Sequence, residues 1–349
     1  MNEASAYMNG STAADIEPIV ELRDIGRTFM KDRVAIPVLQ HIDLTVMPNE
    51  ILCIVGESGC GKTTTGKIIA GLLEPSSGEM RVSGRPVESY KGREKALLRR
   101  QLQIVHQDPF ASLNPAHTIG DILSFPLRRH RMTDGGASLK RRIWELLTMV
   151  DLTPPGDMVN KFPHQLSGGQ RQRVSIARSL TVQPRLIVAD EAVSMVDVSI
   201  RITLLKMLLR LRAELGLTIV FITHDLALAK YFAWEGRIAV MYLGRIVEIG
   251  STSEVIANPS HPYTRALLAA VPEADPEITR AKQAIRLRGD DIPRLTDIPP
   301  GCAFHPRCPY FVPGMCDTVV PALDAAPGFD QQVACIPVQR GEALTLTAL

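Results

Sequence analysis

The segment Gly56 to Thr63, with the sequence GESGCGKT, constrains the fold of this chain more than any other stretch. It lies between an apolar run, Ile51 to Val55, and a run with a helical pattern, which is the context of a phosphate-binding loop. The glycines let consecutive backbone N–H groups converge on one point, and the helix that begins near Lys62 directs its positive end there. Lys62 would reach the β- and γ-phosphates of a nucleotide, and the Thr63 hydroxyl would hold Mg²⁺. The alternative, a glycine-rich turn beside a lysine, is disfavoured by the flanking strand and helix.

Composition bounds the class of protein. The chain has 349 residues, of which 45% are apolar, so it can bury a sizeable core as two units or as one large domain with an appendage. Its 39 basic and 37 acidic residues nearly cancel, which argues against a nucleic-acid partner. The local basic clusters, Arg128 to Arg131 and Lys140 to Arg142, have the pattern of solvated helix faces.

The sequence lacks the features of a membrane-spanning or secreted chain. No apolar run approaches the roughly 18 residues that a membrane-spanning helix needs. Met1 to Glu17 contains acidic residues and has neither a positive cluster nor an apolar segment, so it does not resemble a secretory signal. We therefore expect a cytoplasmic location, where Cys53 and Cys60 would remain packed thiols.

The order of hydrophobic patterns predicts an α/β core with additions. Alternating residues at Ile19 to Asp24 and Val38 to Val46 predict antiparallel strands before the phosphate loop. The first helix is expected to continue through Gly66 to Leu73, and Leu102 to Val105 has the length of another strand. From Ile119 to about Asp151 the pattern is helical and basic, with a break at residues 134–136, which predicts a helical insertion.

Two further apolar strands end in side chains that can do chemistry. Leu186 to Ala189 is followed by Asp190 and Glu191, and Thr218 to Ile222 is followed by Thr223, then His224. In an open parallel sheet these strand ends should converge beside the phosphate loop. Asp190 could then hold Mg²⁺, Glu191 could polarise the attacking water, and His224 could donate to the transferring phosphoryl group. A solvated helix cap is the alternative for the acidic pair, and the phosphate loop disfavours it.

A second anion site is predicted at Leu166 to Gln170, which has the sequence LSGGQ. Ser167 is a good helix N-cap, and the two glycines after it expose backbone donors at the positive end of the following helix. The helical insertion separates this site from the phosphate loop in sequence, so the two could face different directions.

Residues Leu166 to Gln170, just before the Asp190 strand, resemble the signature sequence of ATP-binding cassette (ABC) ATPases. The resemblance covers about Ile19 to Ser260, and six separate elements occur in the family's order. It implies a P-loop NTPase core with an antiparallel β subdomain, an α-helical insertion and an irregular C-terminal extension. In that family two subunits pair head to tail, and each ATP lies between one subunit's phosphate loop and the other's signature.

The same resemblance implies a role for each matching residue. It makes Glu191 the general base, His224 the γ-phosphate contact and Gln107 a ligand of the metal and of the attacking water. Thr63 and Asp190 would join Gln107 at Mg²⁺, and Phe29 would stack on adenine, although a lone aromatic in a strand is more often part of a core. The implied nucleotide contacts are Phe29, Gly56, Ser58, Gly59, Cys60, Gly61, Lys62, Thr63, Thr64 and Asp197, with Ser167, Gly169 and Gln170 serving the partner's ATP.

One segment departs from the family pattern. Most members have Pro-Thr-Ser-Ala-Leu-Asp after the catalytic glutamate, whereas this chain has Ala192 to Val196 followed by Asp197. Because Glu191 and Asp197 are retained, we expect a site that can hydrolyse ATP. The effect of the altered loop on communication between the two sites is left open.

Two segments narrow the resemblance to the oligopeptide/dipeptide group of ABC importers: Gln107 to Pro115 and Pro259 to Leu268. This group implies two membrane permeases, an extracytoplasmic binding protein and a second ATPase subunit, either a copy or a paralogue. The chain would act at the cytoplasmic face of the inner membrane. The solute is left open between peptides, nickel, glutathione, opines and oligosaccharides, and a soluble ABC ATPase and a regulatory iron–sulfur protein remain the rival functions.

Four cysteines near the C-terminus form a candidate metal site: Cys302, Cys308, Cys316 and Cys335. Their spacing supplies a full set of thiolate ligands, and the prolines and glycines around them favour loops that wrap a metal. From the residues alone, zinc, an iron–sulfur cluster and unligated cysteines are all possible. The pattern resembles the cluster-binding tail of peptide-type ABC ATPases, which implies a 4Fe–4S cluster with either a structural or a redox-sensing role.

These observations predict three parts of the chain. Residues 1–18 would form a flexible tail, and residues 19–260 a nucleotide-binding domain with a helical subdomain at about 108–165. Residues 261–349 would form an extension that carries the cysteines.

Overall fold

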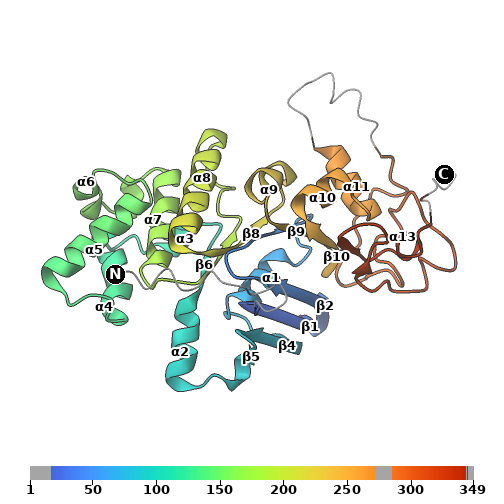
Figure 1. Cartoon of the computed structure of the whole chain (residues 1–349), viewed down its shortest axis with the longest axis horizontal. Coiled ribbons are helices and arrows are strands. Elements are labelled where there is room, and N and C mark those ends of the chain that lie inside the picture. The colour runs from blue at the N-terminus through green and yellow to red at the C-terminus, as the bar shows by residue number, and fades with distance from the viewer. Residues whose placement is uncertain (1–16, 272–284, 343, 345–349) are drawn as a thin grey trace, which may run out of the picture.

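The computed structural model describes residues 17–271, 285–342 and 344, and two β-sheets organise them (Figure 1). Residues 1–16, most of the expected N-terminal tail, lie outside the described residues. The larger sheet consists of β3 (Ile51–Val55), β6 (Leu102–Val105), β7 (Leu186–Asp190), β8 (Thr218–Thr223), β9 (Arg237–Tyr242), β10 (Arg245–Ser251), β11 (Asp324–Ala325) and β12 (Gln331–Val333). Its strand order is β11-β12-β10-β9-β3-β8-β7-β6.

The centre of the larger sheet is parallel. Strand β3 pairs in parallel with both β8 and β9, and β7 pairs in parallel with β8 and β6. Along β3, Cys53 and Val55 face one hydrophobic cluster while Leu52 and Ile54 face the other, so both faces of the strand are buried. This explains the unbroken apolar runs, because a parallel strand covered on both faces has no polar side. The carboxyl ends of β3, β6, β7 and β8 therefore lie at one edge of the sheet.

The smaller sheet is antiparallel and consists of β1 (Val20–Lys31), β2 (Val34–Val46), β4 (Ser77–Val82) and β5 (Arg85–Pro86) in the order β2-β1-β4-β5. The antiparallel strands are as expected, but β1 and β2 are longer than the sequence indicated. Register shifts between β1 and β2 follow Leu22 and Ile25, and Asp24 has a φ of 51°. These bulges interrupt the alternation of apolar and polar residues that predicted the strands.

The helices cover both faces of the larger sheet. The first, α1, ends at Ile69 instead of continuing to Leu73, because Gly71 has a φ of 66° and Leu72 N–H bonds back to the Lys67 carbonyl. The helices are α1 (Lys62–Ile69), α2 (Gly92–Gln101), α3 (Pro109–Ser112), α4 (Ile119–Arg129), α5 (Gly136–Met149), α6 (Pro155–Val159), α7 (Gly168–Leu180), α8 (Val198–Leu215), α9 (Leu226–Phe232), α10 (Thr252–Ala257), α11 (Pro262–Ala270) and α13 (Ile336–Gln339).

The expected helical insertion is present as α4, α5 and α6, which lie with α7 at the β6 end of the sheet in Figure 1. A capping box between Thr118 and Asp121 begins α4, and the expected break separates α4 from α5 at Gly135 and Gly136. None of the helices built from the described residues has both the length and the apolar character that crossing a bilayer requires.

The C-terminal elements lie at the opposite end of the larger sheet (Figure 1). Most of this extension is irregular, as expected, but β12 pairs with β10 and β11 pairs with β12. The side-chain amide of Gln331 also donates to the Ser260 hydroxyl and to the Asn258 carbonyl. The extension is therefore joined to the sheet of the core.

Candidate active site

The phosphate-binding loop connects β3 to α1, as the sequence predicted. Gly56, Gly59 and Gly61 have φ values of 150°, 80° and 108°, which other residues rarely adopt. A Cβ at Gly56 would come within 2.2 Å of the Met241 carbonyl oxygen. Backbone conformation thus favours glycine at all three positions, and the close approach of β9 also requires it at Gly56, whereas a Cβ at Gly59 would have no neighbour within 4 Å. Around them, Ser58 is exposed, Cys60 is buried, and Thr64 lies in the first turn of α1.

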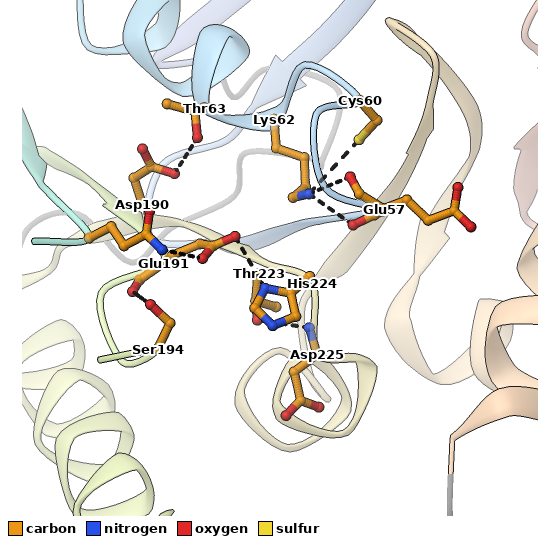
Figure 2. Close-up of polar contacts among 12 residues, drawn as sticks. Glu57, Cys60, Lys62, Thr63, Asp190, Glu191, Ser194, Thr223, His224 and Asp225 are labelled. Atoms are coloured by element: carbon orange, nitrogen blue, oxygen red, sulfur yellow. Dashed lines mark hydrogen bonds and ion pairs between the residues drawn. The ribbon is translucent and has the colours of Figure 1, made fainter. Parts of the chain in front are cut away.

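The Lys62 side chain bonds back to the start of the phosphate loop. Its Nζ donates to the carbonyl oxygens of Gly56, at 2.8 Å, and Glu57, at 2.9 Å, and the side chain is buried (Figure 2). Two neutral acceptors are weak partners for a buried ammonium group compared with a phosphate. The lysine is therefore held at the loop in a position where an incoming phosphate could replace the carbonyl contacts.

Thr63 and Asp190 meet beside this loop. The Thr63 hydroxyl donates to Asp190 Oδ1 over 3.0 Å, from the start of α1 to the carboxyl end of β7 (Figure 2). Burial raises the pKa of the Asp190 carboxyl, whereas the hydrogen bond from Thr63 opposes that rise. A hydroxyl and a carboxylate are the oxygen ligands that suit Mg²⁺ when phosphates and waters complete its shell. The pair therefore fits the predicted magnesium site.

Glu191 contacts both of the other predicted catalytic residues. Gln107 Nε2 donates to Glu191 Oε2 at 2.8 Å, and His224 Nδ1 lies 3.2 Å from Glu191 Oε1. The three side chains follow β6, β7 and β8. The parallel sheet therefore brings Glu191 together with Gln107, which is 84 positions away in the sequence, and with His224, which is 33 positions away. Figure 2 shows Glu191 and His224 beside Asp190. Glu191 has a φ of 46°, a conformation that costs energy for a residue with a side chain and is often found at functional sites.

The signature residues form a separate site at the start of α7. Ser167 Oγ accepts from Gln170 N–H at 3.3 Å, and Gln170 Oε1 accepts from Ser167 N–H at 3.0 Å, which is the predicted cap in reciprocal form. Gly169 packs so closely on α8 that a Cβ would come within 2.7 Å of Ile200. Within the described part of the chain, no hydrogen bond or ion pair joins residues 167–170 to the phosphate loop. The two predicted anion sites are thus apart in one chain.

The segment that departs from the family pattern has its own support. Asp197 is the N-cap residue of α8 and is exposed, without a side-chain cap bond. Arg201 donates to the carbonyl oxygens of Val196, at 3.0 Å, and Ser194, at 3.2 Å. These two bonds stabilise the conformation of the segment. The sequence reasoning missed Arg201, whose charge at the start of α8 gave no indication of carbonyl partners.

Phe29 lies on β1 and is 36% exposed, so it is available to a ligand and is not part of the core. The Arg27 guanidinium lies 4.6 Å from the ring centroid and covers one face. The exposed ring is compatible with the adenine contact, which stays a prediction.

The four C-terminal cysteines line one cavity. Burial raises the pKa of Cys302 to about 11, and that of Cys308 and Cys335 to about 12. Neighbouring thiols add to the rise through their mutual repulsion when charged. Among residues 17–271, 285–342 and 344, however, no group of three or more His, Cys, Asp or Glu side chains is arranged to hold a metal ion. The fold gathers the cysteines as predicted, and the cluster itself stays a prediction.

The sequence reasoning also missed a group of residues that joins the extension to the phosphate loop: Glu57, Tyr242, Tyr263, Phe304 and Arg307. Tyr263 was noticed only as part of the segment Pro259 to Leu268. Nothing local in the sequence connects Arg307 with Glu57, because 250 positions separate them.

Comparison with known proteins agrees with this geometry. The ABC transporter family profile matches residues 39–194, and the profile described as "Oligopeptide/dipeptide transporter, C-terminal region" matches residues 247–316. Oligopeptide transport ATP-binding protein OppF of Escherichia coli is 38% identical over 325 residues, which are 93% of this chain and 95% of OppF. A protein of Brucella ovis named as a candidate ATP-binding protein for peptide import is 41% identical over 320 residues, 91% of this chain and 98% of the relative.

Solved structures share the fold. The structure of cbiO1 from Clostridium perfringens, part of the ABC transporter complex cbiONQ, has a TM-score of 0.60 at 26% identity, over 69% of this chain and 92% of cbiO1. The dimeric structure of the bacterial ABC transporter cassette MJ0796 has a TM-score of 0.59 at 30% identity, over 65% of this chain and 96% of that one. The predicted ABC ATPase fold is confirmed.

Proposed function

Because this chain belongs to the ABC transporter family, as an ATP-binding subunit of the oligopeptide/dipeptide type, we propose that it hydrolyses ATP to power the import of peptides or a related small solute. One observation carries the hydrolytic role: Gln107, Glu191 and His224 form a hydrogen-bonded group beside the Thr63–Asp190 pair. Three strand ends and the phosphate loop supply these side chains, which is the placement that phosphoryl transfer to water requires.

Each residue in this group has a distinct task. The Lys62 ammonium exchanges its two carbonyl partners for the β- and γ-phosphates of ATP, supported by the backbone N–H groups of the phosphate loop that follow Glu57. Thr63, Asp190 and Gln107 are the side chains that would hold Mg²⁺, which when bound neutralises charge on the phosphates. Glu191 accepts a proton from the attacking water, and His224 donates a hydrogen bond to the γ-phosphate as the bond to the leaving group breaks.

The cage around ATP is completed by a second cassette. Ser167, Gly169 and Gln170 are remote from their own phosphate loop and remain available to a partner's nucleotide. Beside them, Met195 and Val198 are 55% and 73% exposed, although both are apolar, and Asp197 lies between them. Exposed apolar residues next to a ligand-binding surface favour an interface, formed with a copy or with a paralogue.

Disulfide trapping tests this arrangement. We expect Ser167→Cys on one chain to crosslink with Gly59→Cys on the other when MgATP is present in the Glu191→Gln background. Pairing Gly59→Cys with a cysteine at Thr203, on the next turns of α8, is the matched control and should give no crosslink. Failure to trap an ATP-loaded pair under any condition would contradict the shared site.

The helical region presents a groove of about 520 Å³ between α2, β6, α4 and α7. Its lining includes Arg99, Arg100, His106, His130 and Arg178, and Gln103 and Ile104 lie on β6 just before Gln107. We propose that this groove receives a cytoplasmic segment of a membrane permease, so that movement at Gln107 reaches the membrane. The chain would then act at the cytoplasmic face of the inner membrane, with two permeases and an extracytoplasmic binding protein.

Reconstitution tests coupling to transport. The chain, its partner ATPase and the two permeases are placed in liposomes, and ATP hydrolysis is measured with the binding protein and with peptides inside or outside. Stimulation of hydrolysis by peptide-loaded binding protein supports peptide import. Hydrolysis that is independent of permeases and binding protein would favour the rival function, a soluble ABC ATPase. Nickel, glutathione, opines and oligosaccharides are tested in the same assay.

The cysteine cavity supports a second part of the proposal. Four thiols line one cavity, and thiolates are the ligands that iron–sulfur clusters require. Burial raises the pKa of Cys302, Cys308 and Cys335, so their thiolate forms need a cation to stabilise them. Cys302, Cys308, Cys316 and Cys335 would hold a 4Fe–4S cluster, which when bound would cross-link the irregular loops of the extension.

Iron analysis tests the cluster. The chain purified without oxygen should be brown and contain roughly four irons per monomer, the ratio of a Cys₄-ligated cluster. Cys308→Ser should lose most of the iron, whereas Cys53→Ser, at a buried cysteine of the core, should retain it. A colourless chain that contains zinc or no metal would contradict the proposal.

We propose the same division of the chain that the sequence predicted. Residues 19–260 form the nucleotide-binding domain, with a helical subdomain at about 108–165, and residues 261–349 form the extension. The positions of α4 to α6 within 119–159, and of β11 and β12 beyond β10 at one end of the sheet, support it.

A further inference from the structure

The C-terminal extension reaches the phosphate-binding loop through an ion pair. Arg307 Nη1 lies 3.1 Å from Glu57 Oε1 and 3.0 Å from Oε2, and Nη2 lies 3.1 Å from Oε1. The Arg307 side chain is 9% exposed and that of Glu57 is 23% exposed. A guanidinium that contacts both oxygens of a carboxylate fixes its direction as well as its charge. The pair therefore holds the second residue of the loop in one orientation.

A second contact from the same region reaches the backbone of Glu57. The Tyr263 hydroxyl accepts from Glu57 N–H at 2.9 Å. Tyr263 is fully buried, and its ring packs against Tyr242 and Phe304 with centroids 4.7 and 5.4 Å apart. Arg307 Nη1 also donates to the Tyr242 hydroxyl at 3.5 Å. These packed rings leave the tyrosine hydroxyl and the guanidinium little freedom to move away from Glu57.

Glu57, which is held by both contacts, also bonds to Lys62, the lysine that would bind phosphate. Its carbonyl oxygen accepts from Lys62 Nζ at 2.9 Å, while its carboxylate points away from Lys62 in Figure 2. The N–H, the carbonyl and the side chain of this residue thus have three different partners: Tyr263, Lys62 and Arg307. A residue held at its N–H, its carbonyl and its side chain fixes the peptide units on both sides of it, which is what a loop that binds phosphate through its backbone needs.

We propose that Arg307 and Tyr263 are positioning residues for ATP, which act through Glu57 to hold the phosphate loop in its binding conformation. The inference rests on the proposed ATPase function. Neither residue touches the phosphates, so their effect lies in affinity for the nucleotide. Arg307 is adjacent to Cys308, and Phe304 lies between Cys302 and Cys308, so these contacts come from the segment that lines the cysteine cavity.

The rival explanation is that the ion pair only fastens the extension to the core. In that case its loss would lower the melting temperature and leave the kinetics of the folded protein unchanged. A positioning role instead changes the KM for ATP with little change in kcat, because the contact is equally present in the bound state and the transition state. The two explanations therefore differ in a measurable way.

The test uses the full chain and steady-state ATP hydrolysis. Arg307→Ala should raise the KM for ATP about tenfold, with kcat within about twofold of wild type, and should weaken binding of a fluorescent ATP analogue equally. Arg307→Lys should recover only part of the affinity, because lysine retains the charge and loses the two-point contact. Arg288→Ala is the matched control, since Arg288 belongs to the same extension and stacks on Phe311 at 4.1 Å. It should leave KM unchanged.

A double-mutant cycle tests whether Arg307 acts on the phosphate loop through Glu57. If Arg307 acts through Glu57, then Glu57→Ala and the double variant should each raise KM about tenfold, whereas independent effects would multiply to about 100-fold. Tyr263→Phe removes one hydroxyl from a buried ring and should raise KM about threefold by leaving an amide without its acceptor. It continues the test if Arg307→Ala fails to fold.

Three results would overturn the inference: an unchanged KM in a folded Arg307→Ala chain, an unchanged KM in Tyr263→Phe, or multiplied effects in the double variant. Failure of the proposed function is distinguishable from these, because the wild-type chain would then neither bind the fluorescent analogue nor hydrolyse ATP.

Discussion

The nucleotide site and the cysteine cavity are held in place by different kinds of structure. Lys62, Asp190, Glu191 and His224 lie at or after the carboxyl ends of the parallel strands of the larger sheet, whose backbone pairing fixes where each side chain begins. The cysteines lie outside helices and strands, in segments where single backbone bonds such as Cys302 N–H to the Cys316 carbonyl, at 2.8 Å, connect the loops. Pairing of β12 with β10, together with side-chain contacts with the core, supplies the remaining support for the extension.

This difference predicts how each region responds to substitution. At the nucleotide site the sheet remains when a side chain is replaced, so a substitution should alter chemistry and leave the fold intact. In the extension, the same contacts that give function also hold the loops, so stability and function should change together.

Glu191→Gln should lower kcat by about 10²- to 10⁴-fold, because glutamine cannot accept a proton from the attacking water. Binding of ATP should be nearly unchanged, since Glu191 contacts Gln107 and His224 and does not belong to the phosphate loop. Single-turnover hydrolysis and nucleotide titration measure the two quantities separately. Glu214→Gln, at an exposed position on α8, is the matched control. Unchanged turnover in Glu191→Gln would remove the glutamate from the mechanism.

The same contrast explains what the sequence could and could not predict. Each residue of the nucleotide site lies within a short motif or directly after an apolar strand, and parallel strands necessarily bring their carboxyl ends to one edge. The sequence therefore predicted that Glu191 and His224 would meet beside the phosphate loop, and the family resemblance added Gln107 to them. It also predicted the Ser167 cap, because a capping box is complete within four residues.

The contacts of the extension could not be found in this way. The Arg307–Glu57 pair joins two loops that are 250 positions apart, and neither loop has a periodic pattern. Strand β12 is only three residues long, and two of them are glutamine, so its sequence has no alternation to detect. These features depend on tertiary packing, which the sequence determines but which no local pattern in the sequence reveals.

A buried carboxylate at the junction of core and extension should make stability depend on pH. Glu248 on β10 accepts from the N–H groups of Ser260, at 2.6 Å, and His261, at 3.0 Å. Burial is the main cause that raises its pKa from 4.5 to about 7. Between these values the folded chain retains a proton that the unfolded chain has released, so the free energy of unfolding falls as pH rises through this window. The expected loss from this group is about 3 kcal/mol.

Comparison with Glu248→Gln isolates this contribution. Urea denaturation of both chains at pH 5, 6, 7 and 8 gives the difference in free energy of unfolding. Wild type should lose stability relative to the variant as pH rises to about 7, and the difference should then level off. His261, whose pKa burial lowers to about 3, contributes the opposite slope, but it is present in both chains and cancels. A difference that does not vary with pH would show that Glu248 stays charged in the folded chain.

Phe29 is another residue that a strand holds in place. Because no core packing depends on its ring, replacing it should change ligand binding without changing stability. Phe29→Ala should weaken ATP binding by roughly 2- to 10-fold, the range that about 0.5–1.5 kcal/mol of aromatic stacking supplies. Phe29→Tyr retains the ring and should bind ATP like wild type, and Phe125→Ala, at another exposed phenylalanine, is the matched control. Because Phe29 is 36% exposed, the melting temperature should change little in either variant. Equal ATP affinity in wild type and Phe29→Ala would exclude the ring from the adenine site.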